Sequence, residues 1–316
     1  MDLAIILALA ALLAVVPPLV DRWALRRGAS PETLAALAAT TLLGVAAVPL
    51  AFAICTGLWA AHDHGRDNLS AAAIGGLLLI ALVAGRTIAR MLAIRRRWTE
   101  LERVAAALQL PEEPGGVTVL PIGESLAFAS STHAFVSQGL IERLTPEQRR
   151  AVIEHEREHA ARGHGRLLAV ACALTHGAFD LHPARHATRA LDRELDALAD
   201  RAAARRVGDP RTVQDTMRAV AATASRECEI DHATGTRIRR LSLDGKRRPL
   251  IDAVVRTITL SLGLLLLASV CVSVHASETW LGVLACVLLL AGFLSLTRPA
   301  LKHKRPLPRT EEMPRA

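Results

Sequence analysis

The sequence predicts a mainly α-helical membrane protein with about five transmembrane helices and a small cytoplasmic α+β domain between them. Apolar residues make up 51% of the chain, and the mean hydropathy of +0.30 is above that of most soluble domains. These apolar residues gather toward the two ends of the chain. The polar middle, residues 98–250, holds the short β-like runs and most of the chemically interesting side chains.

Five apolar segments are each close to the ~20 residues that a helix needs to cross a bilayer. They are residues 3–20, 34–60, 71–94, 254–274 and 280–296. The first segment lacks a basic start and a clean small-residue cleavage site, so we interpret it as a retained span rather than a signal peptide.

Basic residues between these segments predict the orientation. Clusters follow the first span (Arg22, Arg26, Arg27), the third span (Arg95, Arg96, Arg97) and the fifth span, whereas the alternate loops are poor in Arg and Lys. Because basic loops stay in the cytoplasm, we expect a multi-pass protein of the inner or plasma membrane with its N-terminus outside and its polar middle in the cytoplasm. The expected division is 1–97 (three spans), 98–250 (polar domain), 251–297 (two spans) and 298–316 (basic tail).

The net charge of +8 could favour binding to a nucleic acid or to an anionic membrane surface. Tyr is absent and aromatic residues total 3%, so side chains that could stack on bases are scarce. We therefore expect the lipid bilayer as a partner and no direct binding of nucleic acid. None of the five cysteines forms a C-x-x-C pair, which argues against a thiolate metal site or a disulfide framework.

Within the polar middle, residues 95–108 read as a basic amphipathic helix that leads off the membrane. A turn is predicted at 111–116, extended runs at 117–120, 126–130 and 133–137, and helices at 166–177, 182–206 and 210–226. A further helix is predicted to open at Thr145-Pro146, with Gln148 completing a capping box, and to end near Gly163.

That helix carries the sequence His155-Glu156-Arg157-Glu158-His159. Residues four apart lie on one side of a helix, so His155 and His159 can both reach one metal ion. Neutral imidazoles suit Zn²⁺, and a glutamate beside them suits a general base acting on water. The pattern predicts one zinc ion per chain, with Glu156 as the catalytic base; the plain alternative is a chance match on a charged helix.

A third ligand is expected from the acidic run at residues 192–200. Asp196 and Asp200 are four residues apart and share a helix face, so Asp196 could bind zinc while Asp200 orients an imidazole. Glu194 is the alternative ligand. The run could also be a solvated acidic face that pairs with Arg193 and Arg201.

The run from Ala151 to His159, with His164 after it, resembles the BlaR/MecR-type membrane metallopeptidases, which are gluzincins that cut a repressor. His182-Pro183, residues 135–144 and residues 237–241 are also similar to that family. The resemblance covers most of residues 117–241 and implies a membrane-embedded, cytoplasm-facing zinc endopeptidase that cleaves a regulatory protein such as a transcriptional repressor.

In that family the third ligand is a Glu followed four residues later by Asp, and these positions fall on Asp196 and Asp200. Asp196 is one methylene shorter than the family's Glu, and Gly165 stands where the family often has an acidic residue. The resemblance also implies a cation that stabilises the oxyanion. Arg237 is our candidate, with His164 second; His164 is also expected to support the metal ligands.

Two alternatives stay open. The first is membrane protein quality control of the HtpX type, whose proteases share H-E-x-x-H and a downstream acidic pair. The second is a non-catalytic zinc-binding signal transducer. This alternative stays open because Asp196 is shorter than the Glu of the resembled family.

Overall fold

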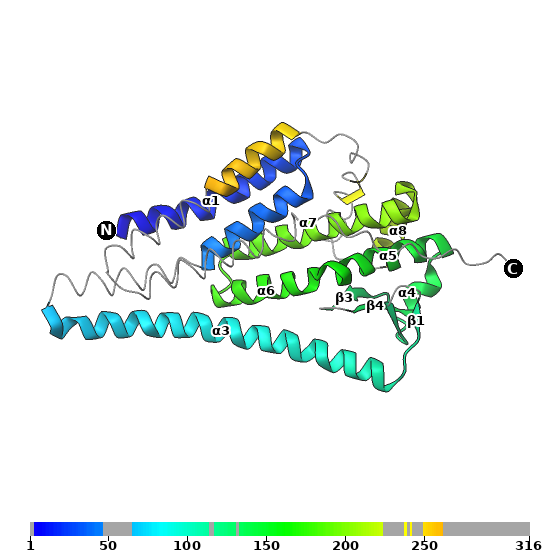
Figure 1. Ribbon diagram of the computed structural model, residues 1–316, viewed down its shortest axis with the longest axis horizontal. Helices are drawn as coiled ribbons and strands as arrows, with labels where there is room; N and C mark the ends of the chain where they lie inside the picture. Colours follow the sequence, from blue (N-terminus) through cyan, green and yellow to red (C-terminus); the bar gives the residue numbers. More distant parts are fainter. Residues whose placement is uncertain are drawn as a thin grey trace.

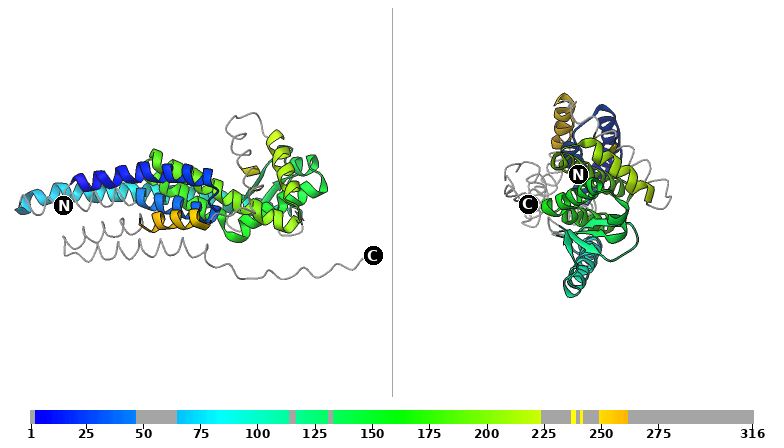
Figure 2. Two further views of the ribbon diagram at one scale, coloured as in Figure 1. Left: turned by 90° about the horizontal axis from the view of Figure 1, so that it is seen from above. Right: turned by 90° about the vertical axis from the view of Figure 1, so that its right-hand side faces the viewer.

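The computed structural model describes residues 3–46, 65–113, 117–130, 133–223, 237–238, 241 and 249–261. These parts form an elongated molecule in which long helices run side by side and a small sheet sits at one end (Figures 1 and 2). The expected mostly helical architecture with a small sheet is confirmed.

Four helices lie wholly or partly away from the sheet (Figure 1). They are α1 (Leu3–Arg27), the helix Pro31–Ala46, α3 (Gly65–Ala107) and residues 249–261. Leu34 and Leu37 pack with Ile251 and Val255, which brings residues from opposite ends of the sequence into one apolar cluster. Pro17 and Pro18 lie inside α1 rather than ending it.

Helix α3 joins two elements that the sequence suggested separately. The third predicted span and the basic helix at 95–108 form one continuous helix of 43 residues. Its end packs on the sheet, where Ala105 contacts the cluster of Leu120 and Phe135. The apolar part of α3 and the sheet are therefore connected by one continuous helix.

Among the described residues, one helix is long and apolar enough to cross a membrane, Ile74–Ala107, and its apolar window is not buried by other parts of the protein. Pro31–Ala46 is a shorter apolar helix that overlaps the start of the second predicted span. The fourth predicted span lies mostly, and the fifth entirely, outside the described residues. Five transmembrane helices are thus not supported by the structure and stay a prediction.

The sheet has four short strands in the order β1-β2-β4-β3. They are β1 (Glu112–Glu113), β2 (Val117–Leu120), β3 (Ala127–Ala129) and β4 (Ala134–Ser137). The three predicted strands are confirmed, whereas β1 forms where we expected only a turn. β2 and β4 are parallel, and β3 pairs antiparallel with β4 at the edge of the sheet.

Five helices complete the domain. They are α4 (Gln138–Arg143), α5 (Pro146–Arg162), α6 (His164–Gly177), α7 (His182–Val207) and α8 (Pro210–Thr223). Helix α5 lies between the sheet, α7 and α8 (Figure 1). Its predicted start is confirmed, because Thr145 and Gln148 form a capping box. It ends at Gly163, whose φ of 65° is a conformation that glycine adopts without strain.

Candidate metal centre

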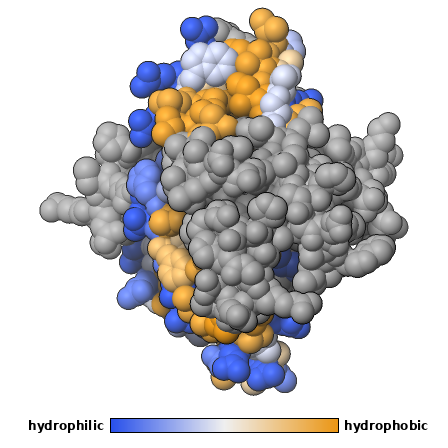
Figure 3. All heavy atoms as spheres, turned by 90° about the vertical axis from the view of Figure 1, so that its left-hand side faces the viewer, coloured by the Kyte–Doolittle hydropathy of each residue, from blue (hydrophilic) through white to orange (hydrophobic). Residues whose placement is uncertain are grey.

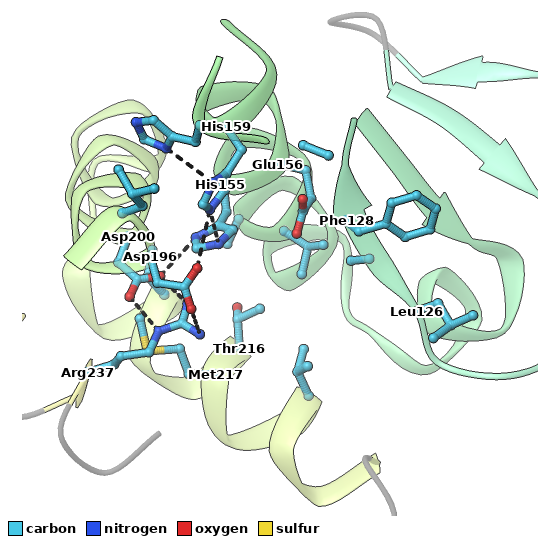
Figure 4. Close-up of a pocket in the computed structure, with 18 of the residues that line it drawn as sticks. Leu126, Phe128, His155, Glu156, His159, Asp196, Asp200, Thr216, Met217 and Arg237 are labelled. Atoms are coloured by element: carbon cyan, nitrogen blue, oxygen red, sulfur yellow. Dashed lines mark hydrogen bonds and ion pairs between the residues drawn. The ribbon is translucent and has the colours of Figure 1, made fainter. Parts of the chain in front are cut away.

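Helix α5 presents His155 and His159 to a cavity, as the four-residue spacing predicted (Figure 4). Their Nε2 atoms lie 3.1 Å apart. Two imidazole nitrogens on one tetrahedral zinc ion would be roughly 3.3 Å apart, given Zn–N bonds of about 2.0–2.1 Å. The two rings are therefore already set at a spacing that one metal ion can bridge.

Asp196 of α7 supplies the third potential ligand. An Asp196 oxygen lies 3.5 Å from His159 Nε2, and one ligand atom from each of His155, His159 and Asp196 falls within 4.8 Å of the others. Although burial opposes ionisation, the charge of Arg237 and the contact with His159 lower the pKa of Asp196. An ionised carboxylate beside two imidazoles is a donor set that suits zinc.

Asp200 lies against the first histidine. One Asp200 oxygen lies 2.9 Å from His155 Nδ1. When Nδ1 donates its proton to this carboxylate, Nε2 is left with its lone pair directed at the ligand cluster. Burial disfavours the charged form, but the Asp200 carboxylate still raises the pKa of His155.

Arg237 lies behind this cluster and holds both aspartates. Its Nε and Nη2 donate to the two oxygens of Asp200 at 2.8 and 2.7 Å, and its Nη1 lies 3.0 Å from an Asp196 oxygen. All three guanidinium nitrogens are thus engaged with carboxylates. This geometry fits a residue that positions the ligands better than one that reaches a substrate oxyanion, the role that the resemblance implied.

His164 of α6 lies against the second histidine. Its Nδ1 lies 3.1 Å from His159 Nδ1. Burial, and then the charge of His159, lower the pKa of His164 to about 3, so its ring is neutral and can accept a hydrogen bond. A proton on His159 Nδ1 leaves Nε2 free to bind metal.

Glu156 lines the same cavity and is buried. Burial raises the pKa of Glu156, which makes its carboxylate a stronger base than a solvated glutamate. In Figure 4 its side chain lies between the two histidines and Phe128 of β3. It is placed to act on a water molecule held in the cavity.

Glu194 lies apart from this group. It is fully buried and its Oε1 accepts from Arg193 Nε at 2.8 Å. The same guanidinium donates to both oxygens of Asp21 in α1, at 2.8 and 3.0 Å. The structure thus brings Asp196, and not Glu194, to the two histidines.

The cavity has a volume of about 500 Å³ and is lined by both polar and apolar residues. The polar lining includes the histidines and aspartates, together with Asp192, which lies one turn before Asp196. The apolar lining includes Val213, Met217 and Val220 of α8. We did not predict these α8 residues, although their spacing of four and three residues is the signal of a shared helix face.

Close packing against the backbone explains the glycine at position 165. A Cβ atom at this position would collide with the backbone carbonyl of Ser130, just after β3. The start of α6 therefore lies directly against the end of the edge strand. This close approach accounts for glycine where the resembled family often has an acidic side chain.

Residues 92–243, just under half of the chain, match the family model described as Peptidase family M48. Peptidases of this family are metal-dependent and typically use zinc, in agreement with the donor set above. The match does not confirm the narrower BlaR/MecR resemblance. Neither the search of curated proteins nor the search of solved structures found a match.

Proposed function

We propose that this protein is a zinc-dependent endopeptidase of the inner or plasma membrane, with its active site in the cytoplasm. The observation that carries the proposal is the meeting of His155, His159 and Asp196 beside the buried carboxylate of Glu156. The family match to residues 92–243 supports the same class of enzyme.

In this proposal His155, His159 and Asp196 hold one zinc ion, Asp200 and His164 orient the two imidazoles, and Arg237 holds the aspartates in place. When bound, zinc supplies Lewis acidity to water and to the substrate carbonyl. Glu156 removes a proton from the attacking water and returns it to the leaving nitrogen as the C–N bond breaks. The products are a new carboxylate and a new amine.

Strand β3 offers a place for the substrate backbone. It pairs with β4 on one side only among the described strands, and Ala127, Phe128 and Ala129 line the cavity. A peptide added to this edge would make main-chain hydrogen bonds that do not depend on its sequence. Its side chains would then alternate between the cavity and the solvent.

The proposed substrate is a regulatory protein such as a transcriptional repressor. A second candidate function is membrane protein quality control. The apolar residues of the cavity lining favour it, because Val213, Met217 and Val220 suit the apolar segments that unfolded proteins expose. A single cleaved protein in membranes that contain the active enzyme would support the first role. Many cleaved proteins would support the second.

The test is a Glu156→Gln variant compared with the wild-type protein in proteoliposomes. We expect peptide cleavage to fall by roughly 10²–10⁴-fold, which is typical for loss of a general base. Zinc content should stay at one ion per chain, because Glu156 is not a proposed ligand. Unchanged cleavage by this variant would contradict the proposed role of Glu156. Zinc binding without cleavage by either protein would favour a non-catalytic zinc-binding transducer.

A further inference from the structure

Helices α6 and α7 form a hairpin that lies among helices assigned above to membrane spans. A Cβ atom at Gly177, the last residue of α6, would collide with the Thr87 side chain of α3. On its other side α6 contributes Ala171 to a cluster that contains Ala38 and Leu42 of the helix Pro31–Ala46. The hairpin is therefore packed between the second and third predicted spans.

The tip of this hairpin is strained and apolar. Phe179 and Asp180 both have a φ of +54°, a conformation that a bulky residue such as Phe adopts only at a cost of about 1–3 kcal/mol. The side chains of Phe179 and Leu181 are nevertheless 44% and 50% exposed. Local strain is thus maintained in a turn that leaves two large apolar side chains uncovered by the protein.

Arg86 of α3 is bound to the same tip. Its Nε donates to the carbonyl of His176 at 3.1 Å, its Nη2 lies 3.9 Å from Asp180, and its guanidinium carbon lies 4.8 Å from the centre of the Phe179 ring. Charged groups within a membrane are usually paired with an opposite charge or with backbone carbonyls. Arg86 meets both kinds of partner.

The position of Arg86 along α3 indicates how deep the hairpin tip would lie in the proposed membrane. It precedes the basic cluster Arg95–Arg97 by nine residues, which is about 14 Å along a helix. Exposed apolar side chains lie on both sides of it, including Leu82 and Ile88. Apolar side chains are also prominent on this end of the molecule, at the upper edge of the view where α1 and residues 249–261 lie (Figure 3).

We propose that the α6–α7 tip, residues Phe179, Asp180 and Leu181, inserts into the cytoplasmic leaflet and that Phe179 and Leu181 contact lipid acyl chains. The tip extends the exposed apolar surface of α3, and its one carboxylate is turned to Arg86. This inference rests on the proposed membrane location but not on proteolysis. Charge patterning predicts that the whole domain, residues 98–250, lies in the cytoplasm. The proposal instead places residues 179–181 in the bilayer.

The experiment uses the full-length protein, one chain per phosphatidylcholine nanodisc. A fluorescent dansyl amino acid is encoded singly at Leu181, at Leu78 in α3 as the lipid-facing control, or at Arg218 in α8 as the solvent-facing control. Each sample is prepared with ordinary lipid and with lipid brominated on its acyl chains. We expect bromine to reduce the fluorescence at Leu181 and Leu78, and to leave it unchanged at Arg218.

Quenching at Leu78 without quenching at Leu181 would overturn the inserted tip and leave the membrane span intact. Absence of quenching at both positions would overturn the tip together with the proposed membrane location. Because each disc holds one chain, an absence of quenching at Leu181 cannot arise from a second copy that covers the tip. Zinc content and peptide cleavage of the Leu181 variant, measured in the same discs, report whether it has folded.

Discussion

Helix α7 carries two buried networks of carboxylates and arginine that serve different ends. Around Asp196 and Asp200 the carboxylates face histidines and a cavity, and their arginine, Arg237, comes from a distant segment. Around Glu194 the arginine is the neighbouring Arg193, and the second carboxylate is Asp21 of α1. The same residue types therefore form a candidate metal centre in one place and a helix-to-helix attachment in the other, because the first network faces the paired His155 and His159.

The largest effect is expected from Asp196→Ala. It removes one of three proposed ligands, so we expect loss of bound zinc and of all peptide cleavage, measured by metal analysis and a peptidase assay. Asp196→Glu is the matched control, because it restores the ligand of the resembled family and should retain zinc. Full zinc occupancy in the alanine variant would remove Asp196 from the ligand set.

Glu194→Gln should act on stability instead. Breaking a buried ion pair typically costs about 3–5 kcal/mol, so the free energy of unfolding in detergent should fall by about that amount. Zinc content of the folded fraction should stay at one ion per chain. Loss of zinc here, with zinc retained in Asp196→Ala, would reverse the comparison and make Glu194 the ligand.

A smaller effect on the metal centre is expected from Arg237→Ala. Arg237 contacts the ligands without contacting the metal position, so its removal should weaken zinc affinity by about 10–100-fold, the usual range for residues that orient ligands. Competition with a fluorescent chelator measures this affinity. If cleavage by the zinc-saturated variant fell as far as in Glu156→Gln, Arg237 would be an oxyanion donor, as the resemblance implied.

The smallest effect is expected from Gly163→Ala. A side chain in the left-handed conformation at the end of α5 costs about 1–2 kcal/mol. Thermal unfolding should report this loss, while zinc content stays unchanged. A loss of zinc would show that the α5–α6 turn controls the position of His159 or His164 more directly than its backbone conformation suggests.

The parts of this molecule that depend on local signals were predictable. The capping residues at Thr145 and Gln148 and the glycine at 163 defined α5, and the spacing of His155 and His159 placed both rings on one side of it. The parallel pairing of β2 with β4 depends on contacts between separate segments and has no comparable local signal.

The choice between Asp196 and Glu194 as the third ligand also depends on contacts between separate segments, which local sequence signals do not reveal. Helical periodicity shows which residues of α7 share a face, but not which face turns toward α5. In the structure, Arg193 pairs with Asp21 of α1, the residue directly after the first predicted span, and Glu194 pairs with Arg193 and not with the histidines. The family resemblance points to Arg237 as a cation of the site, but it does not identify the carboxylates that Arg237 contacts in the fold.

If α3 spans the membrane as proposed, its unbroken course sets the distance between the cavity and the lipid. The helix continues for twelve residues beyond Arg95 before it ends against the sheet, a rise of about 18 Å. A continuous helix of this length would keep β3 and the cavity at a fixed, short distance from the membrane surface. A segment that emerges from the same bilayer would meet the cavity at a high effective concentration, whereas a freely diffusing protein would not.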